Sequence, residues 1–431
     1  MSKEKKERPL SEDENKIGKS LRIMISSALK KREENMAQND VIFYEPLNEA
    51  EIDERAPLNK GSIDMWFLLW SLLLVCFGAV MSYSASSVYA EQVLGESTTY
   101  FLWRYIIFSL ISIGITALFV LYARPWFWRV FGVGAYAVAI VLLILVIFIG
   151  TTGGGAQRWI EIGPITIQPS EIAKTAVVMV LALYMTKYDK QINSTHKFGG
   201  SFKHGFFIPL IIIGILCALI ILQPHLSGTI IVGMIGLTVM FLGGTRLKWL
   251  SIFLGIGIIG VILFVSFFGY SMERIQIWLH IDEVNPLGEA WQTLQGLYAI
   301  GSGGFFGLGL GSSRQKFGYV SQPQNDFIFT IICEELGFVG AFLVVFLFAL
   351  LVWRGIKIGQ NAPDKFSSLV AWGLTLKIAL QAILNIAVVT NSMPNTGISL
   401  PFFSSGGTSL MLQIFEIGII LSISRFSTNK K

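Results

Sequence analysis

Three acidic side chains lie beside and within one apolar run, and their positions make them the clearest candidates for chemistry. Asp326 precedes the run, whereas Glu334 and Glu335 lie inside it. Acidic groups at membrane depth are costly and by default mark functional sites. At ~1.5 Å per helical residue, Glu334 would lie roughly 12 Å below Asp326. We expect Asp326 at a membrane surface, and at least one glutamate paired with a buried cation or amide, for which Lys377 is a candidate.

A second cluster combines a glycine-rich stretch with the start of the next apolar segment. Glycines 153–155 allow a close backbone approach to a ligand, and the guanidinium of Arg158 suits phosphate. Ser170 can cap a helix that begins at Glu171. Glu171 and Lys174 are three positions apart and share a helix face. The pattern fits an anion site or a local Glu–Lys pair with a snorkelling lysine, and both readings stay open.

Two further loops could contribute contacts to a ligand. Residues 301–316 are glycine-rich and include Arg314 and Lys316, which could meet an anion, although loop bases are often simply solvated. That loop has no GxxxxGK[ST] pattern, so a nucleotide site is not expected. Residues 393–407 hold two prolines and three glycines and include Thr396 and Ser404. Non-helical backbone at membrane depth is tolerated only where it lines protein or a polar cavity.

A polar stripe runs upstream of the second loop. Lys377, Gln381 and Asn385 are spaced four apart, so they share one face of a helix. Polar groups within a span face a bundle interior or a pathway. We favour interhelical hydrogen bonding over direct ligand contact for this stripe.

Composition places the chain in the membrane. Of its 431 residues, 53% are hydrophobic and 14% charged, against about 25% charged in soluble domains. The fold class we predict is an all-α polytopic membrane protein with about ten transmembrane helices. The four histidines are scattered without metal-binding spacing, and the three cysteines lie in apolar runs, so no dedicated metal site is expected. The segments we expect to span are 65–84, 101–122, 128–150, 171–186, 206–222, 227–244, 249–270, 328–353, 367–390 and 408–424.

Charge sets the expected orientation. Lysines and arginines gather in alternate loops, which the positive-inside rule makes cytoplasmic, together with both termini. A large extracellular loop, 271–327, then lies between spans seven and eight, and Arg158 and Asp326 face outward. Residues 1–62 form a polar tail that we expect to be largely disordered. The net charge of +5 does not indicate nucleic acid, because the bases lie beside apolar segments.

Five motifs follow one another along the chain. They are Gly-Ala-Gln-Arg-Trp (155–159), Gln-Pro-Ser-Glu-Ile-Ala-Lys (168–174), Gln-Asn-Asp-Phe-Ile-Phe (324–329), Glu-Glu-Leu-Gly (334–337) and Pro-Asn-Thr-Gly-Ile-Ser-Leu-Pro-Phe (394–402). In this order they resemble the SEDS family (shape, elongation, division and sporulation), which includes FtsW, RodA and SpoVE. The resemblance covers nearly all of residues 62–425, and residues 310–316 are most similar to the division and sporulation branch.

The resemblance implies an inverting peptidoglycan glycosyltransferase that polymerises lipid II at the outer face of the bacterial cytoplasmic membrane. It implies residues 63–426 as the catalytic domain and 427–431 as a short cytoplasmic tail. It also implies a septal location and a complex with a class B penicillin-binding protein and other divisome or sporulation-septum proteins. By analogy, Asp326 matches the family's essential external aspartate, and Glu171 and Lys174 match positions that line its cavity.

Two departures from the family are visible. The usual Gln-Pro-Asp-Leu-Gly-Thr is replaced by Gln223-Pro224-His225-Leu226-Ser227-Gly228-Thr229, which removes an acid. The usual Ser-Tyr-Gly-Gly is Ser404-Ser405-Gly406-Gly407. The first change puts in doubt any role for an acid at position 225, and neither change touches Asp326.

The residues and the resemblance predict one mechanism. Asp326 would act as general base, an effect worth roughly 10²–10⁴-fold, while Arg158 and Lys174 stabilise the leaving diphosphate. A loosely held Mg²⁺ or Mn²⁺ bridged by substrate is an alternative contributor. Arg314, Lys316, Thr396 and Ser404 are the remaining candidate substrate contacts. The rival functions are a lipid II flippase, which would need polar groups through the full membrane depth, and a non-catalytic scaffold for the penicillin-binding protein.

Overall fold

A computed structural model describes most of the chain beyond the N-terminal tail. All described residues belong to the second of two compact units, Asn59–Lys431. The predicted tail therefore lies outside the described residues except for positions 61 and 62, as does the C-terminal tail except for residue 427. The described ranges are 61–153, 156–163, 165–193, 201–267, 269–281, 288, 290–321, 323–404 and 407–427.

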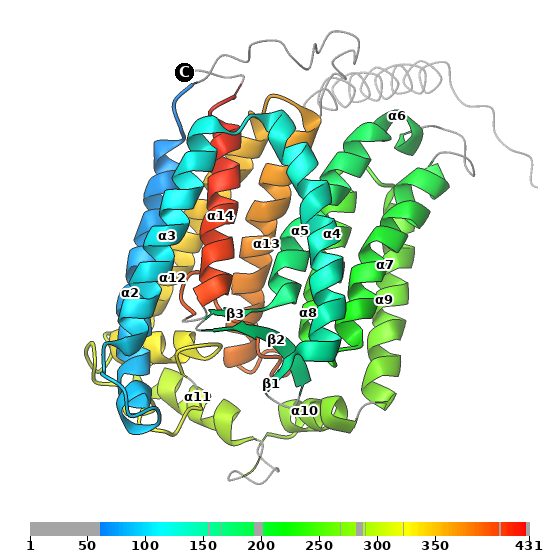
Figure 1. The fold of residues 1–431 in the computed structure, drawn as a ribbon. Coiled ribbons are helices and arrows are strands. Elements are labelled where there is room, and N and C mark those ends of the chain that lie inside the picture. The colour runs from blue at the N-terminus through cyan, green and yellow to red at the C-terminus, as the bar shows by residue number, and fades with distance from the viewer. Residues whose placement is uncertain are drawn as a thin grey trace, which may run out of the picture. The chain divides into compact units, whose positions relative to one another are not determined.

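Every segment that we expected to span a membrane is a helix (Figure 1), so the predicted class of helical membrane protein is confirmed. Within the described ranges, seven helical stretches are long and apolar enough to cross a membrane. They are α2 (Met65–Gln92), α3 (Tyr100–Tyr122), α4 (Pro125–Ile149), the stretch Lys203–Ile221 formed by η2 (Lys203–Phe207) and α7 (Ile208–Ile221), α12 (Ile328–Gln360), α13 (Lys365–Val389) and α14 (Gly407–Ser424). The remaining expected segments are α5 (Pro169–Lys187), α8 (Leu226–Leu242) and α9 (Leu247–Phe267). The count of ten spans stays a prediction.

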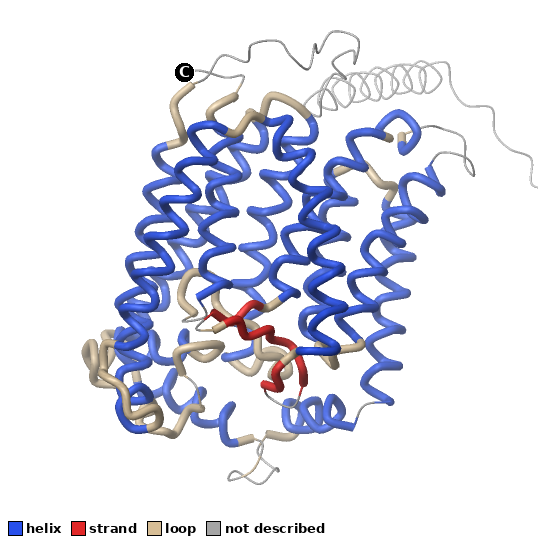
Figure 2. Tube along the Cα trace, in the orientation of Figure 1, coloured by secondary structure: helices blue, strands red, loops and turns tan. Residues whose placement is uncertain are grey.

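Short elements occupy the connections. One end carries α6 (Asp189–Ile192), and the other carries α10 (Gly269–Leu279), α11 (Trp291–Ser302) and a small antiparallel sheet (Figures 1 and 2). The sheet consists of β1 (Thr151–Gly153), β2 (Ala156–Ile162) and β3 (Ile165–Ile167), in that order. We expected a glycine-rich loop here. The β-branched residues that pair across β2 and β3 explain why the backbone is extended instead.

Ion pairs tie the basic connections together at the end that carries α6. Arg354 pairs with Asp64 at 2.9 Å, and Arg129 pairs with Asp364 at 2.6 Å. Lys365 binds both Asp189 and the main-chain oxygen of Gly243. Helix ends far apart in sequence therefore meet at this end.

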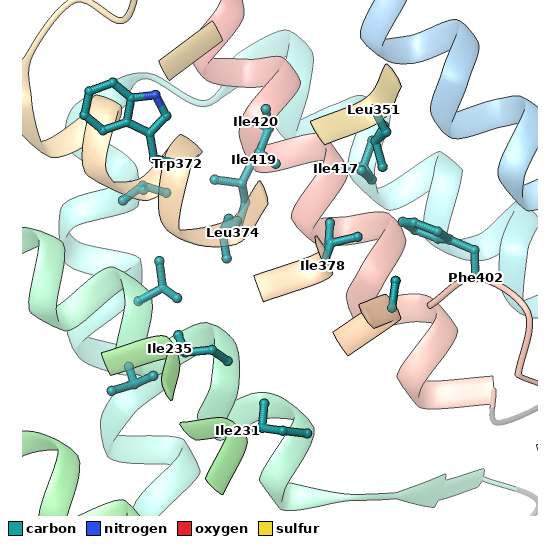
Figure 3. Packing of buried hydrophobic residues seen from close by; sticks show 14 of the residues in the cluster. Ile231, Ile235, Leu351, Trp372, Leu374, Ile378, Phe402, Ile417, Ile419 and Ile420 are labelled. Atoms are coloured by element: carbon teal, nitrogen blue, oxygen red, sulfur yellow. The ribbon is translucent and has the colours of Figure 1, made fainter. Parts of the chain in front are cut away.

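The bundle core is apolar and interdigitated. Helix α13 packs on α12, α5 and α8, and buried side chains from α8, α12, α13 and α14 fill the space between them (Figure 3). By contrast, α2, α3, α4 and α9 expose many large apolar side chains, as expected of surfaces that face lipid.

One buried ion pair crosses this core. Lys377 of α13 donates to both carboxylate oxygens of Glu416 on α14, at 2.6 and 2.8 Å, and Thr175 of α5 donates to the same carboxylate. Both charged side chains are almost fully buried. The prediction that Lys377 serves Glu334 or Glu335 is therefore wrong. The sequence reasoning overlooked Glu416 because it lies alone in an otherwise apolar segment.

Glu334 and Glu335 instead hold the loop 303–316. The Ser313 hydroxyl and the Arg314 amide donate to Glu334. Ser84 of α2, the Ser313 amide and Lys316 donate to Glu335. The loop reaches these acids because α12 breaks at Gly337, whose φ of 64° favours glycine. Without a Cβ, Gly337 also lets the backbone of residues 305–307 pass against it.

The buried pair gives a stability prediction. Lys377→Met or Glu416→Gln alone leaves one buried charge uncompensated, which should destabilise the bundle by about 3–5 kcal/mol. The Lys377→Met/Glu416→Gln double variant leaves neither charge and should unfold at a higher temperature than either single variant. Thermal unfolding of purified protein, followed by tryptophan fluorescence, measures the difference. Arg129→Gln, in a partly exposed pair, is the matched control with a smaller effect. A double variant no more stable than the singles would contradict this account.

Candidate functional site

The small sheet positions Arg158. In β2, Trp159 pairs with Thr151 of β1 and Ile160 pairs with Ile167 of β3. The sheet is anchored to the bundle because the Thr408 hydroxyl at the start of α14 donates to the main-chain oxygen of Thr166 in β3, at 2.6 Å. Arg158 then donates from Nη2 to the main-chain oxygen of Pro224 at 2.6 Å. The guanidinium of Arg158 therefore lies at Pro224, the residue before His225.

The first turn of α5 holds a buried charge pair. Lys174 donates to Glu171 Oε1 at 2.5 Å and to Gln381 Oε1 of α13 at 3.3 Å. The local Glu–Lys pair that we considered is therefore present, and it is tied to the polar stripe. The other carboxylate oxygen, Glu171 Oε2, is buried without a hydrogen bond to any described residue. The predicted cap is wrong, because α5 begins at Pro169, one residue before Ser170, and the Ser170 hydroxyl makes no hydrogen bond within the described chain.

We expected the polar stripe on α13 to bind neighbouring helices, but the side-chain amide nitrogens of Gln381 and Asn385 bind main-chain atoms of two non-helical segments. Gln381 Nε2 donates to the oxygen of Ser399 at 3.1 Å. Asn385 Nδ2 donates to the oxygens of Asp326 and Ile398, at 2.7 and 2.6 Å. The stripe therefore fixes the chain on both sides of the outer mouth.

Asp326 lies against the 395–399 turn. A Cβ placed on Gly397, whose φ is 65°, would lie 3.3 Å from Asp326 Oδ2, so the absent side chain leaves room for the carboxylate. Burial raises the pKa of Asp326 above its ordinary value, while a hydrogen bond from its own backbone and the charge of Arg274 oppose that shift. The carboxylate is therefore a stronger base than one in water.

His225 lies beside the two cations. Its burial, followed by the charges of Arg158 and Lys174, lowers the pKa of His225 to about 3, so the imidazole is neutral at physiological pH. Nδ1 is buried and has no hydrogen bond to a described residue. Two residues on, the Ser227 hydroxyl donates to the oxygen of Thr396. This bond links the cationic region to the turn that contacts Asp326.

The structure thus brings together part of the predicted set. Hydrogen bonds link these residues to shared segments: Arg158 binds Pro224, and Ser227, three residues on, binds Thr396. On α13, Gln381 binds Lys174 of the Glu171–Lys174 pair, and Asn385 binds the main-chain oxygen of Asp326. Ser404 is buried between the turn and α14. The roles of these residues toward substrate stay predictions.

Two further predicted contacts lie on the loop 303–316, and their roles toward substrate also stay predictions. Lys316 is buried and bound to Glu335 and to the oxygen of Gly311. Arg314 is exposed on the same loop. The sequence reasoning missed Arg274 of α10, which donates to the oxygen of Asn395 at 2.8 Å. The available signal was a lone base in a short amphipathic helix within the long external loop.

Comparisons with known proteins agree with this architecture. Stage V sporulation protein E of Bacillus subtilis is 40% identical over 373 residues, which cover 85% of this chain and 98% of that protein. A probable peptidoglycan glycosyltransferase FtsW of Trichlorobacter lovleyi is 36% identical over 375 residues, covering 86% and 95%.

Two solved structures share the fold. A peptidoglycan synthase complex, described as coordinating polymerization and crosslinking, contains a chain with a TM-score of 0.67 and 24% identity that covers 84% of this chain and 98% of its own. The rod shape determining protein RodA of Thermus thermophilus gives 0.62 and 22%, covering 85% and 98%. A family model described as a cell cycle protein, spanning FtsW, RodA and SpoVE, matches residues 64–429. The chain therefore belongs to the FtsW/RodA/SpoVE family, as its motifs predicted.

Proposed function

We propose that this protein is a peptidoglycan glycosyltransferase that polymerises lipid II at the outer face of the cytoplasmic membrane, with Asp326 as general base. The proposal rests mainly on the Asp326 carboxylate, which has a raised pKa and lies against the 395–399 turn. The same turn is hydrogen-bonded to Ser227, next to the region of Arg158, Lys174 and His225. The names of the FtsW relatives support the activity.

The proposed step is a single displacement. Asp326 removes the proton from a sugar 4-hydroxyl as that oxygen attacks the anomeric carbon of lipid II. The bond from that carbon to the diphosphate breaks, and the lipid diphosphate leaves with the electron pair. Attack opposite the leaving group inverts the anomeric centre. Arg158 and Lys174 stabilise the negative charge that develops on the diphosphate, and such electrostatic stabilisation of the transition state is usually the largest contribution to catalysis.

His225 makes the leaving-group side more positive than an acid would. A carboxylate at this position would offset one of the two neighbouring cations, whereas a neutral imidazole offsets neither. Since Glu171 already compensates Lys174, the replacement avoids placing a second carboxylate beside the two cations.

A resident metal ion does not fit the described residues. They contain no group of three or more His, Cys, Asp or Glu side chains placed to hold one, and Asp326 is a single carboxylate. We therefore assign no step to a metal. A Mg²⁺ or Mn²⁺ ion carried by the substrate diphosphate remains part of the proposal.

The proposed partner is a crosslinking transpeptidase, a class B penicillin-binding protein, acting at a division or sporulation septum. Support comes from the solved synthase complex with the same fold and from the sporulation and FtsW names of the relatives.

Removing the base should abolish polymerisation. Asp326→Asn keeps the shape of the side chain but cannot accept the proton, so the rate should fall by at least about 100-fold. The assay follows glycan strands made from labelled lipid II by the purified protein with its partner transpeptidase. Glu161→Gln, an exposed acid on the same side of the molecule, should retain activity. Normal polymer from Asp326→Asn would refute the base, and lipid II scrambling without polymer from wild type would favour a flippase.

Arg274 should set the acid limb of the pH profile. Its charge lowers the pKa of Asp326, so Arg274→Gln should raise that pKa, and a higher pH is then needed to keep the base deprotonated. In pH profiles of kcat/KM, the acid limb of the variant should lie at higher pH than that of wild type. Arg314→Gln, an exposed base on the distant loop, should leave the limb in place. An unshifted limb in Arg274→Gln would argue against Asp326 as the titrating group.

The same carboxylate should cost stability. Because folding raises the pKa of Asp326, the folded state binds the proton more tightly, and stability falls as pH rises through the interval between the two pKa values. At neutral pH, Asp326→Asn should therefore unfold at a higher temperature than wild type, and the gap should close in acid. Thermal unfolding at several pH values measures this. A lower midpoint for the variant at neutral pH would show that burial is not the dominant effect.

A further inference from the structure

A polar cavity of about 240 Å³ lies between α10, α11 and the segment after α13. These elements come together at the end of the molecule that carries the small sheet (Figure 1). Ile277 forms an apolar part of the wall, and the other lining side chains are polar or aromatic. They are Arg274, Trp278, Gln292, Thr293, Asn391 and Asn395.

Contacts within the wall hold several of these side chains in place. Trp278 Nε1 donates to the oxygen of Asn391 at 3.0 Å, and Arg274 donates to the oxygen of Asn395 at 2.8 Å. Gln292 donates to the oxygen of Ser321 at 3.2 Å. The amide of Asn391, by contrast, makes no side-chain hydrogen bond that the described residues account for. The shape of the cavity is therefore fixed by hydrogen bonds in its wall, and the Asn391 side chain can still donate and accept hydrogen bonds.

The cavity adjoins the proposed base. Asn395 in its wall is two residues from Gly397, against which the Asp326 carboxylate lies. Arg274 is close enough to influence the charge of Asp326. Thr396 lies between Asn395 and Gly397, and its main-chain oxygen accepts a hydrogen bond from Ser227, two residues after His225 in the cationic region. The 395–397 turn therefore has the amide-lined cavity at one end and the Arg158–Lys174 region at the other.

The lining chemistry suits a sugar better than a phosphate. Three side-chain amides and a hydroxyl can exchange hydrogen bonds with sugar hydroxyls and an N-acetyl group. An indole offers a large rigid face with a polar edge. The single cation among the described lining residues, Arg274, already binds Asn395 and lies near the Asp326 carboxylate, so a diphosphate gains little there.

We infer that this cavity is the subsite for an N-acetylated sugar of the acceptor glycan, whose 4-hydroxyl gives its proton to Asp326. The inference rests on the proposed function and adds to it the places of the acceptor and of the leaving group. The acceptor sugar enters beside α10 and α11, while the lipid diphosphate departs toward Arg158 and Lys174. The 395–397 turn separates the two substrates.

Direct binding tests the subsite without requiring turnover. The probe is a lipid-free tetrasaccharide of alternating N-acetylglucosamine and N-acetylmuramic acid, titrated into the full chain in nanodiscs and followed by saturation-transfer NMR. Trp278→Ala removes the indole. Asn391→Gly removes the amide yet keeps a residue that adopts the left-handed φ of 55° found there. Gln276→Ala, an exposed position on α10, is the matched control.

We expect Trp278→Ala and Asn391→Gly each to weaken tetrasaccharide binding by about tenfold, whereas Gln276→Ala binds within about twofold of wild type. Undetectable binding to wild type, or wild-type binding by both cavity variants, would overturn the subsite. Binding as expected with no polymer from lipid II would instead reject the proposed function and leave the saccharide site standing, so the two failures are distinguishable.

Discussion

One amide nitrogen joins the two non-helical segments on which the site is built. Asn385 Nδ2 donates to the main-chain oxygens of both Asp326 and Ile398. Each oxygen belongs to a stretch that no helix satisfies, and an unsatisfied buried carbonyl costs about 1–3 kcal/mol. Because Asn385 projects from a long, well-packed helix, it transfers the rigidity of the bundle to the start of α12 and to the outer turn. The position of the carboxylate is therefore set by the core and not by the loops around it.

The same dependence explains what could be predicted from sequence. Helix positions followed from runs of apolar residues, and the Glu171–Lys174 pair followed from their spacing. The function of the stripe on α13 was also predictable, since polar groups on a buried helix face must find partners. The identities of those partners were not, because they are main-chain oxygens in segments without periodicity. Lys377 illustrates the limit, since its partner, Glu416, lies 39 residues away on another helix.

The sheet and the external loop escaped prediction for a related reason. Alternation in strands as short as β1 and β3 is too brief to distinguish from a glycine-rich loop. Likewise, an unbroken helix was the simplest extrapolation for the expected span 328–353. The break at Gly337 depends on the backbone of residues 303–309 lying alongside, which only the fold brings there. In both places, tertiary contacts and not local preference decide the backbone.

The acid pair at the start of α12 also constrains how the protein is made. Glu334 accepts a hydrogen bond from Ser313, and Glu335 accepts hydrogen bonds from Ser84 and Lys316. All three partners are synthesised before the two acids. Placing such acids in a membrane unpaired costs several kcal/mol, so α12 enters most easily when its partners are already in position. Ser84 and Glu335 are 251 residues apart. The chain must therefore keep α2 accessible through most of its own translation, which makes the order of membrane insertion a property encoded in the finished fold.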